Sequence, residues 1–138
     1  MIIKLRDAKQ LVSAPRDIYE MLKEFFKTVD TVDRDKEHFF VIHLNTRNKV
    51  KVFELVSLGT INASLVHPRE VYTRAVAIRS ASIIIAHNHP SGDSEPSDKD
   101  REITKRLQEA GILIGIDLLD HLIYTQSGFY SFKEKGTL

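Results

Sequence analysis

Apolar residues recur at steps of three and four positions in the stretch that follows Pro15, which is the period of an amphipathic helix. They are Ile18, Met21, Leu22, Phe25, Phe26 and Val29. Ser13 and Pro15 are start signals ahead of this stripe, so a helix is predicted over residues 15–29. Similar stripes predict a helix over residues 68–80 and another from Ser97 or Asp98 to Ala110, with Gly111 as the terminator of the last one.

Between these helices lie short runs that are either nearly all apolar or alternate between apolar and polar, as β-strands do. The predicted strands are HFFVIHL (38–44), KVKVFELVS (49–57), SIIIAHNH (82–89), ILIGIDLLDHLIYT (112–125) and FYSF (129–132). The turn sequence NTRN separates the first two strands and predicts an antiparallel hairpin. Because helices and strands alternate through the second half, the sequence predicts an α/β domain.

The composition adds limits to this prediction. A chain of 138 residues with 42% hydrophobic and 28% charged residues is typical of one soluble globular domain. We expect residues 1–35 to form a helical lead-in and residues 133–138 a loose tail. The N-terminus lacks the apolar stretch of a secretory signal and no apolar run is long enough to span a membrane, so a cytoplasmic location is expected.

The stretch HNHPSGDSEPSDKD, residues 87–100, is the richest in chemistry. In a strand, residues two apart project from the same face, so His87 and His89 point the same way at the strand's carboxyl end. Open α/β sheets usually bind their ligands at this end. The alternative is that the two imidazoles make only local hydrogen bonds, since short motifs often arise by chance.

Ser97 and Asp100 also allow two interpretations. The spacing S-x-x-D before an amphipathic run matches a capping box, in which both side chains bond to the helix start. A carboxylate on the first helical turn can equally face the neighbouring strand end. Because the chain has no cysteine, any metal must be held by histidine and carboxylate. Two imidazoles and one carboxylate are donors of the kind that a catalytic zinc uses, with a fourth position for water.

The combined pattern H-x-H-x7-S-x2-D resembles the signature of the JAMM or JAB/MPN-domain metalloproteases. The stretches SLGTINASLVHPREVYTRAV, IIIAHNHPSGDSEPSDKDREIT and GIDLLDHLIYT are similar to the RadC branch of that family, and the likeness extends from about Lys36 onward. The resemblance implies a curved mixed sheet flanked by helices, a three-layer architecture like that of the zinc deaminases. It also implies an association with DNA repair, and we expect the short, single-domain form of the family.

The resemblance further implies roles for individual residues. His87, His89 and Asp100 match the ligands of a Zn²⁺ cofactor, and Ser97 matches a serine that stabilises the oxyanion. The family's general base is a glutamate, for which Glu37 is our choice and Glu54 the alternative. On charge patterning alone, Glu37 is a solvated residue at a strand start. The implied reaction is hydrolysis of an amide or isopeptide bond in a peptide substrate.

His121 is a candidate to orient a metal ligand from behind, although a buried strand histidine with satisfied hydrogen bonds is the alternative. A second hypothesis for the whole domain is a non-catalytic DNA- or protein-binding module with a structural or vestigial metal site. A formal net charge of +1 does not support strong nonspecific binding to DNA. A membrane partner is not expected.

Overall fold

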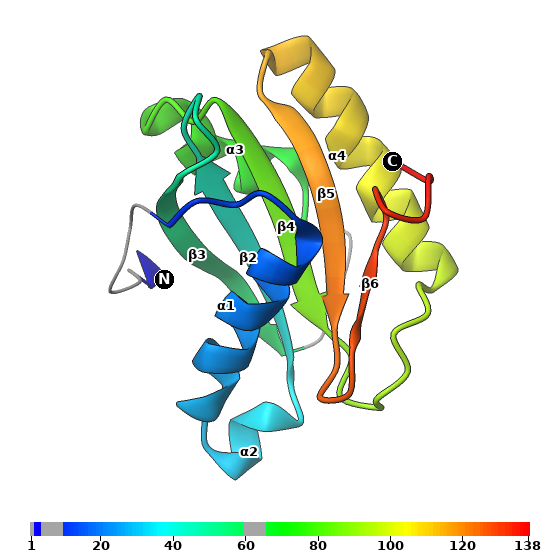
Figure 1. The fold of residues 1–138 in the computed structure, drawn as a ribbon. Helices are drawn as coiled ribbons and strands as arrows, with labels where there is room; N and C mark the ends of the chain where they lie inside the picture. Colours follow the sequence, from blue (N-terminus) through cyan, green and yellow to red (C-terminus); the bar gives the residue numbers. More distant parts are fainter. Residues whose placement is uncertain (1, 4–9, 60–65) are drawn as a thin grey trace.

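The computed structural model describes residues 2–3, 10–59 and 66–138 (Figure 1). The strands are β1 (Ile2–Ile3), β2 (Glu37–Leu44), β3 (Val50–Gly59), β4 (Ser82–Asn88), β5 (Asp117–Tyr124) and β6 (Phe129–Ser131). The helices are α1 (Pro15–Lys27), α2 (Thr31–Arg34), α3 (Pro68–Ala77) and α4 (Asp98–Ile114). Together they confirm the predicted α/β fold class.

The strands form one mixed sheet in the order β1-β3-β2-β4-β5-β6. Strands β2 and β3 make the predicted antiparallel hairpin, and β4 pairs antiparallel with β2. The β4–β5 pair is parallel, so the chain must cross over between them, and α4 makes this crossover. As a result, the N-terminal turn of α4 lies beside the carboxyl end of β4.

Helices cover both faces of the sheet and give it three layers (Figure 1). Helix α1 packs its apolar stripe on one face, where Leu22 and Phe26 meet Phe40 and Phe53. Helices α3 and α4 pack on the other face, against the side chains of β2, β4 and β5 that alternate with the first set. Every residue of the central strand β4 is buried, which explains its nearly continuous apolar run.

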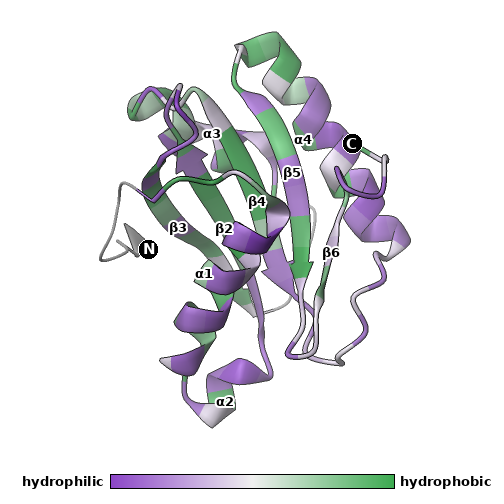
Figure 2. Cartoon of the chain, viewed as in Figure 1, coloured by the Kyte–Doolittle hydropathy of each residue, from purple (hydrophilic) through white to green (hydrophobic). Residues whose placement is uncertain are grey.

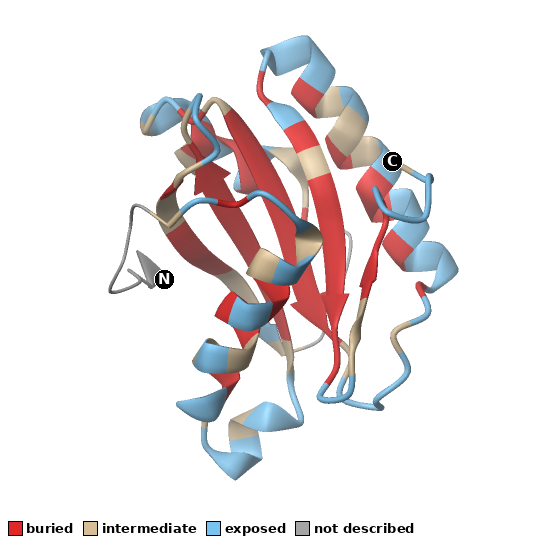
Figure 3. Cartoon of the chain, in the orientation of Figure 1, coloured by how far each residue is buried: buried red, intermediate tan, exposed pale blue. Residues whose placement is uncertain are grey.

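The distribution of polarity follows these layers. The central strands are mainly hydrophobic and buried, whereas the outward faces of α1 and of most of α4 are polar and exposed (Figures 2 and 3). The last turn of α4 differs, because its apolar residues Ile112, Leu113 and Ile114 are exposed. Helix α1 begins where the Asp17 carboxylate accepts hydrogen bonds from the backbone N–H groups of Ser13 and Ala14. The bond from Ser13 lowers the pKa of Asp17 below its ordinary value, despite the opposing effect of burial.

The predicted end of the third helix was wrong, because α4 continues past Gly111 to Ile114 and ends at Gly115 with a φ of 85°. Gly111 lies inside the helix, where a Cβ atom would be 2.5 Å from the Tyr72 hydroxyl oxygen. The glycine therefore allows close packing of α4 on α3 and does not stop the helix. Residues 112–114, predicted as strand, form the last helical turn, and β5 starts only at Asp117.

The two ends of the chain are partly described. Residues 4–9 of the predicted N-terminal lead-in lie outside the described residues, and α1 and α2 occupy most of its remainder. After β6 the chain turns back, with the Thr137 N–H donating to the Phe132 carbonyl, and Leu138 packs against two apolar clusters. Among the described segments, no helix combines the length and apolar character that crossing a membrane requires.

Candidate metal centre

His87, His89 and Asp100 meet at the carboxyl end of β4. His87 belongs to the strand and His89 follows it by one residue, and both rings project toward the first turn of α4. Asp100 lies on that turn. The loop between them, residues 89–97, reverses direction at Gly92, whose φ of +90° suits glycine, and the Gly92 N–H donates to the His89 carbonyl.

The three side chains place their donor atoms in a small triangle. His87 Nε2 lies 2.9 Å from His89 Nε2 and 3.2 Å from Asp100 Oδ1. His89 Nε2 lies 3.1 Å from Asp100 Oδ2. Zinc bond lengths of about 2.0–2.2 Å put the donors of a tetrahedral site roughly 3.3–3.6 Å apart. The triangle is therefore close to the size that a small divalent ion needs.

The outer partner of His87 determines which of its ring nitrogens carries a proton. The Thr104 hydroxyl donates to the Asp100 carbonyl at 2.7 Å, so its oxygen accepts from His121 Nδ1 at 2.5 Å. His121 Nε2 then accepts a hydrogen bond from His87 Nδ1 at 2.8 Å. This assignment leaves a lone pair on His87 Nε2, directed at the triangle.

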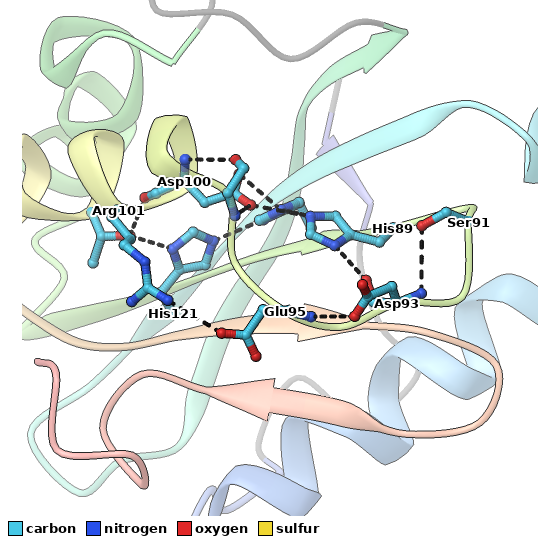
Figure 4. Close-up of polar contacts among 10 residues, drawn as sticks. His89, Ser91, Asp93, Glu95, Asp100, Arg101 and His121 are labelled. Atoms are coloured by element: carbon cyan, nitrogen blue, oxygen red, sulfur yellow. Dashed lines mark hydrogen bonds and ion pairs between the residues drawn. The ribbon is translucent and has the colours of Figure 1, made fainter.

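His89 is oriented in the same sense by a different partner. Its Nδ1 lies 2.7 Å from the Asp93 carbonyl oxygen, which can only accept, so Nδ1 carries the proton and Nε2 has a lone pair (Figure 4). The lone pairs of His87 and His89 thus face each other across 2.9 Å, beside a carboxylate. Such an arrangement requires a cation between them, either a proton or a metal ion.

The electrostatics of the centre agree with this requirement. Burial acts to raise the pKa of Asp100, but hydrogen bonds with His87 and His89 outweigh it and hold that pKa well below its ordinary value. The bond to Asp100 raises the pKa of His89 against the effect of burial. Burial lowers the pKa of His121 far below its ordinary value, so His121 stays neutral.

Ser97 and Asp100 form the capping box that their spacing predicted. The Ser97 hydroxyl oxygen accepts from the Asp100 N–H at 3.1 Å, and Asp100 Oδ2 accepts from the Ser97 N–H at 2.9 Å. The same Oδ2 atom faces His89. Both interpretations of this aspartate are therefore compatible, because one carboxylate caps the helix and belongs to the triangle.

A cavity of about 570 Å³ opens onto the centre and is lined by Glu37, His89, Ser97 and Asp100 among others. Phe39 pairs with His87, so the antiparallel register places Glu37, two residues earlier, beside His89. The charge of Glu37 contributes to the raised pKa of His89, which is consistent with this proximity.

The structure places Glu54, the alternative base, elsewhere. Its carboxylate contacts His43 Nε2 at 2.9 Å and Arg74 Nε at 3.1 Å, and it does not line the cavity at the centre. Thr104 was not singled out from the sequence, although its position four residues after Asp100 puts both on one face of α4. His121 does contact His87, one of the two placements considered for it.

His89 also borders a second cavity of about 570 Å³, between α1 and the turn after β5. Three cationic residues line this cavity, namely Lys23, Lys27 and Arg34. Two of the charges are shared with α1 carboxylates, because Lys27 pairs with Glu24 at 2.9 Å and Lys23 with Glu20 at 3.8 Å. The candidate centre is thus flanked by two cavities, both of which His89 lines.

A three-layer α/β domain with two strand-end imidazoles and a helix-start carboxylate in mutual contact defines a candidate metal-binding domain. The sequence matches the profile of the RadC-like JAB domain over residues 12–137, and the chain belongs to this family. A UPF0758 protein of Chlorobium phaeovibrioides is 46% identical over 133 residues, which cover 96% of this chain and 57% of the relative.

Two further relatives give the same picture. A UPF0758 protein of Pelodictyon phaeoclathratiforme is 47% identical over 96% of this chain and 58% of its own length. One from Rubrobacter xylanophilus is 45% identical over 94% of this chain and 55% of its own length. The chain therefore spans little more than half the length of these curated relatives.

Proposed function

We propose that this domain is a zinc-dependent hydrolase of amide or isopeptide bonds. The observation that carries the proposal is the convergence of two imidazole lone pairs and one carboxylate on a single point at the mouth of a cavity. His87, His89 and Asp100 would hold the ion, and their donor types suit zinc. A bound zinc ion supplies Lewis acidity, which polarises a carbonyl group and makes water more acidic.

Glu37 and Ser97 supply the remaining chemistry in this proposal. Glu37 lies on the cavity wall beside His89, where its carboxylate can take a proton from the attacking water and later deliver it to the leaving amine. The Ser97 oxygen accepts from the Asp100 N–H, so its own proton is available to donate to the oxyanion of the tetrahedral intermediate.

The first test is the metal content of the purified domain after zinc reconstitution, measured by elemental mass spectrometry. We expect about one zinc per chain in the wild type and its loss in His87→Ala, His89→Ala and Asp100→Asn. His67→Ala is the matched control, because His67 caps α3 away from the centre. Zinc retained by all three site variants would refute the metal centre.

The second test separates metal binding from catalysis. Glu37→Gln should keep its zinc yet lose hydrolysis of a panel of quenched-fluorescent peptides and lysine isopeptides, by about 100-fold or more. Glu70→Gln, on the exposed face of α3, is the control and should behave as the wild type. Full turnover by Glu37→Gln would assign the base to another group.

A non-catalytic module that binds nucleic acid is the second candidate, and the cations of the cavity beside α1 are the observation that favours it. Their ion pairs with Glu20 and Glu24 weaken this case. Binding to single- and double-stranded DNA at low and moderate salt discriminates the candidates. Salt-sensitive binding that disappears in a Lys23→Ala/Lys27→Ala/Arg34→Ala variant would support the module.

A further inference from the structure

Asn88 stands between the two histidines of the candidate centre, but its side chain is directed away from them, as strand alternation requires. It is only 4% exposed. Its Oδ1 atom accepts a hydrogen bond from the His38 N–H at 2.6 Å, and its Nδ2 group donates to the Lys36 carbonyl at 3.1 Å. One buried amide thus bonds to the residues on both sides of Glu37.

These two contacts hold both peptide bonds of Glu37. The Lys36 carbonyl belongs to the peptide bond before Glu37, and the His38 N–H belongs to the one after it. On the β3 side, the backbone of Glu37 is paired with Gly59. On the β4 side, the ladder ends at the Phe39–His87 pair, and the Asn88 amide takes the place of the next rung.

An amide is the side chain that fits this position. It offers both an acceptor and a donor, as the His38 N–H and the Lys36 carbonyl require. Aspartate would keep the bond to the His38 N–H but turn an acceptor toward the Lys36 carbonyl. Leucine has the same shape and would leave the His38 N–H unpaired in a buried place, although the Lys36 carbonyl still faces His38 Nδ1 at 2.9 Å.

We propose that Asn88 is a positioning residue, which fixes the carboxylate of Glu37 relative to the two histidines that flank Asn88 in the sequence. This role rests on the proposed function, in which Glu37 is the proton acceptor. Asn88 lies between the proposed ligands His87 and His89 in the sequence, and its side chain bonds to the backbone on both sides of Glu37. A displacement of the two ligands therefore moves the start of β2 with them. The Asn88 side chain then helps to preserve the spacing between base and ion, together with the β2–β4 ladder that ends at the Phe39–His87 pair.

A position-sensitive measurement tests the role without a known substrate. The domain is loaded with Co²⁺, and the paramagnetic shift of the Glu37 carboxyl carbon is measured by NMR in the wild type and in Asn88→Leu. We expect both proteins to bind one Co²⁺ and the Glu37 shift to change in the variant. Tyr72→Phe, which removes a buried hydrogen bond between α3 and α4, is the control and should leave the shift unchanged.

Asn88→Asp provides the same comparison if the leucine variant does not fold. On any peptide or isopeptide that the wild type cleaves, kcat should fall roughly 10- to 100-fold with little change in KM, since a small misplacement of a catalytic group is costly. Combined with Glu37→Gln, the Asn88 substitution should add no further loss.

The outcomes separate the two proposals. An unchanged Glu37 shift, or full kcat in the Asn88 variants, would overturn the positioning role and leave the hydrolase proposal standing. Absence of Co²⁺ and zinc binding in the wild type would refute the metal centre, and the role of Asn88 with it.

Discussion

Among the residues that the structure describes, a histidine cluster around His43 and a histidine cluster around His87 differ in what their ring nitrogens face. In the cluster around His43, Nδ1 lies 3.0 Å from the Ser80 hydroxyl and Nε2 lies 2.9 Å from the Glu54 carboxylate. Arg74 contacts the second oxygen of Glu54. Each polar atom there meets a complementary partner, so the cluster is complete without an ion.

In the cluster of His87, His89 and Asp100, the outward nitrogens are also satisfied, but the inward nitrogens face each other. Both clusters contain imidazole and carboxylate, and both are largely buried. The difference teaches that the direction of the lone pairs, set by the hydrogen-bond partners of the outward nitrogens, distinguishes a candidate cation site from a structural hydrogen-bond network.

The largest expected effect is on zinc affinity, when one histidine of each cluster is replaced by alanine in separate variants. His87→Ala should lower zinc affinity by far more than the roughly 10- to 100-fold typical of a lost outer partner, because it removes a donor. His43→Ala should keep the zinc and lower the free energy of unfolding by about 2–4 kcal/mol, because it leaves Glu54 and Ser80 with fewer partners. Zinc titration and urea unfolding measure the two effects. Loss of zinc in both variants would contradict the assignment of metal binding to the His87 cluster alone.

A smaller effect is expected from the outer partner of the metal centre. Thr104→Val keeps the shape of the side chain but removes the acceptor for His121, so zinc affinity should fall roughly 10- to 100-fold. Thr73→Val is a matched control, since Thr73 also donates to the carbonyl four residues earlier but lies exposed on α3. Equal zinc affinities in the two variants would show that the hydroxyl does not set the ligand's tautomer.

The Glu54 carboxylate gives the His43 cluster a distinct pH dependence. Burial opposes ionisation, but bonds with His43 and Arg74 hold the pKa of Glu54 below the ordinary 4.5. A depressed folded-state pKa contributes stability above the unfolded value that is lost as the pH falls. Glu54→Gln should therefore destabilise the domain by about 1–3 kcal/mol near neutral pH and by less below pH 4.5.

Urea unfolding at several pH values measures this difference, and Glu70→Gln on the exposed face of α3 is the control. A difference that grows toward acid would contradict the assigned direction of the shift. Zinc content should not change, since Glu54 lies outside the cavity at the centre.

The smallest effect is expected for Ser80→Ala. It removes the hydroxyl facing His43 Nδ1 and should cost about 0.5–1.5 kcal/mol of unfolding free energy, with no change in bound zinc. Thermal unfolding with and without zinc measures both quantities. A change in the stabilisation by zinc would reveal coupling between the two clusters.

The parts of this molecule that could be predicted from the sequence depend on local spacing. His87 and His89 share a strand face, and Asp100 follows a helix-capping serine, so their meeting needs only the loop to close. The α/β order was likewise visible in the alternation of hydrophobic periods. The family resemblance then pointed to Glu37, whose catalytic role stays a prediction.

What escaped the sequence depends on contacts between distant segments. The sequence left two placements open for His121, and the choice between them needs the parallel register of β4 and β5, which includes an irregularity between Ile83 and Ile84. The predicted end of α4 was wrong because Gly111 is needed for the close approach of Tyr72 and does not terminate the helix. The two hydrogen bonds from Asn88 to the backbone around Glu37 require the start of β2 and the end of β4 to lie side by side, which no local sequence pattern encodes.

The double use of Asp100 has a consequence for how the domain responds to proteolysis. Its carboxylate caps the start of α4 and also faces His89, so an ion at the candidate centre would contact residues at both ends of the 89–97 loop. By linkage, an ion that binds only the folded loop stabilises it against local unfolding. The resistance of this exposed loop to proteolytic cleavage should therefore rise with ion concentration. The cleavage rate would then measure how much of the protein has an ion bound, without a substrate of the domain itself.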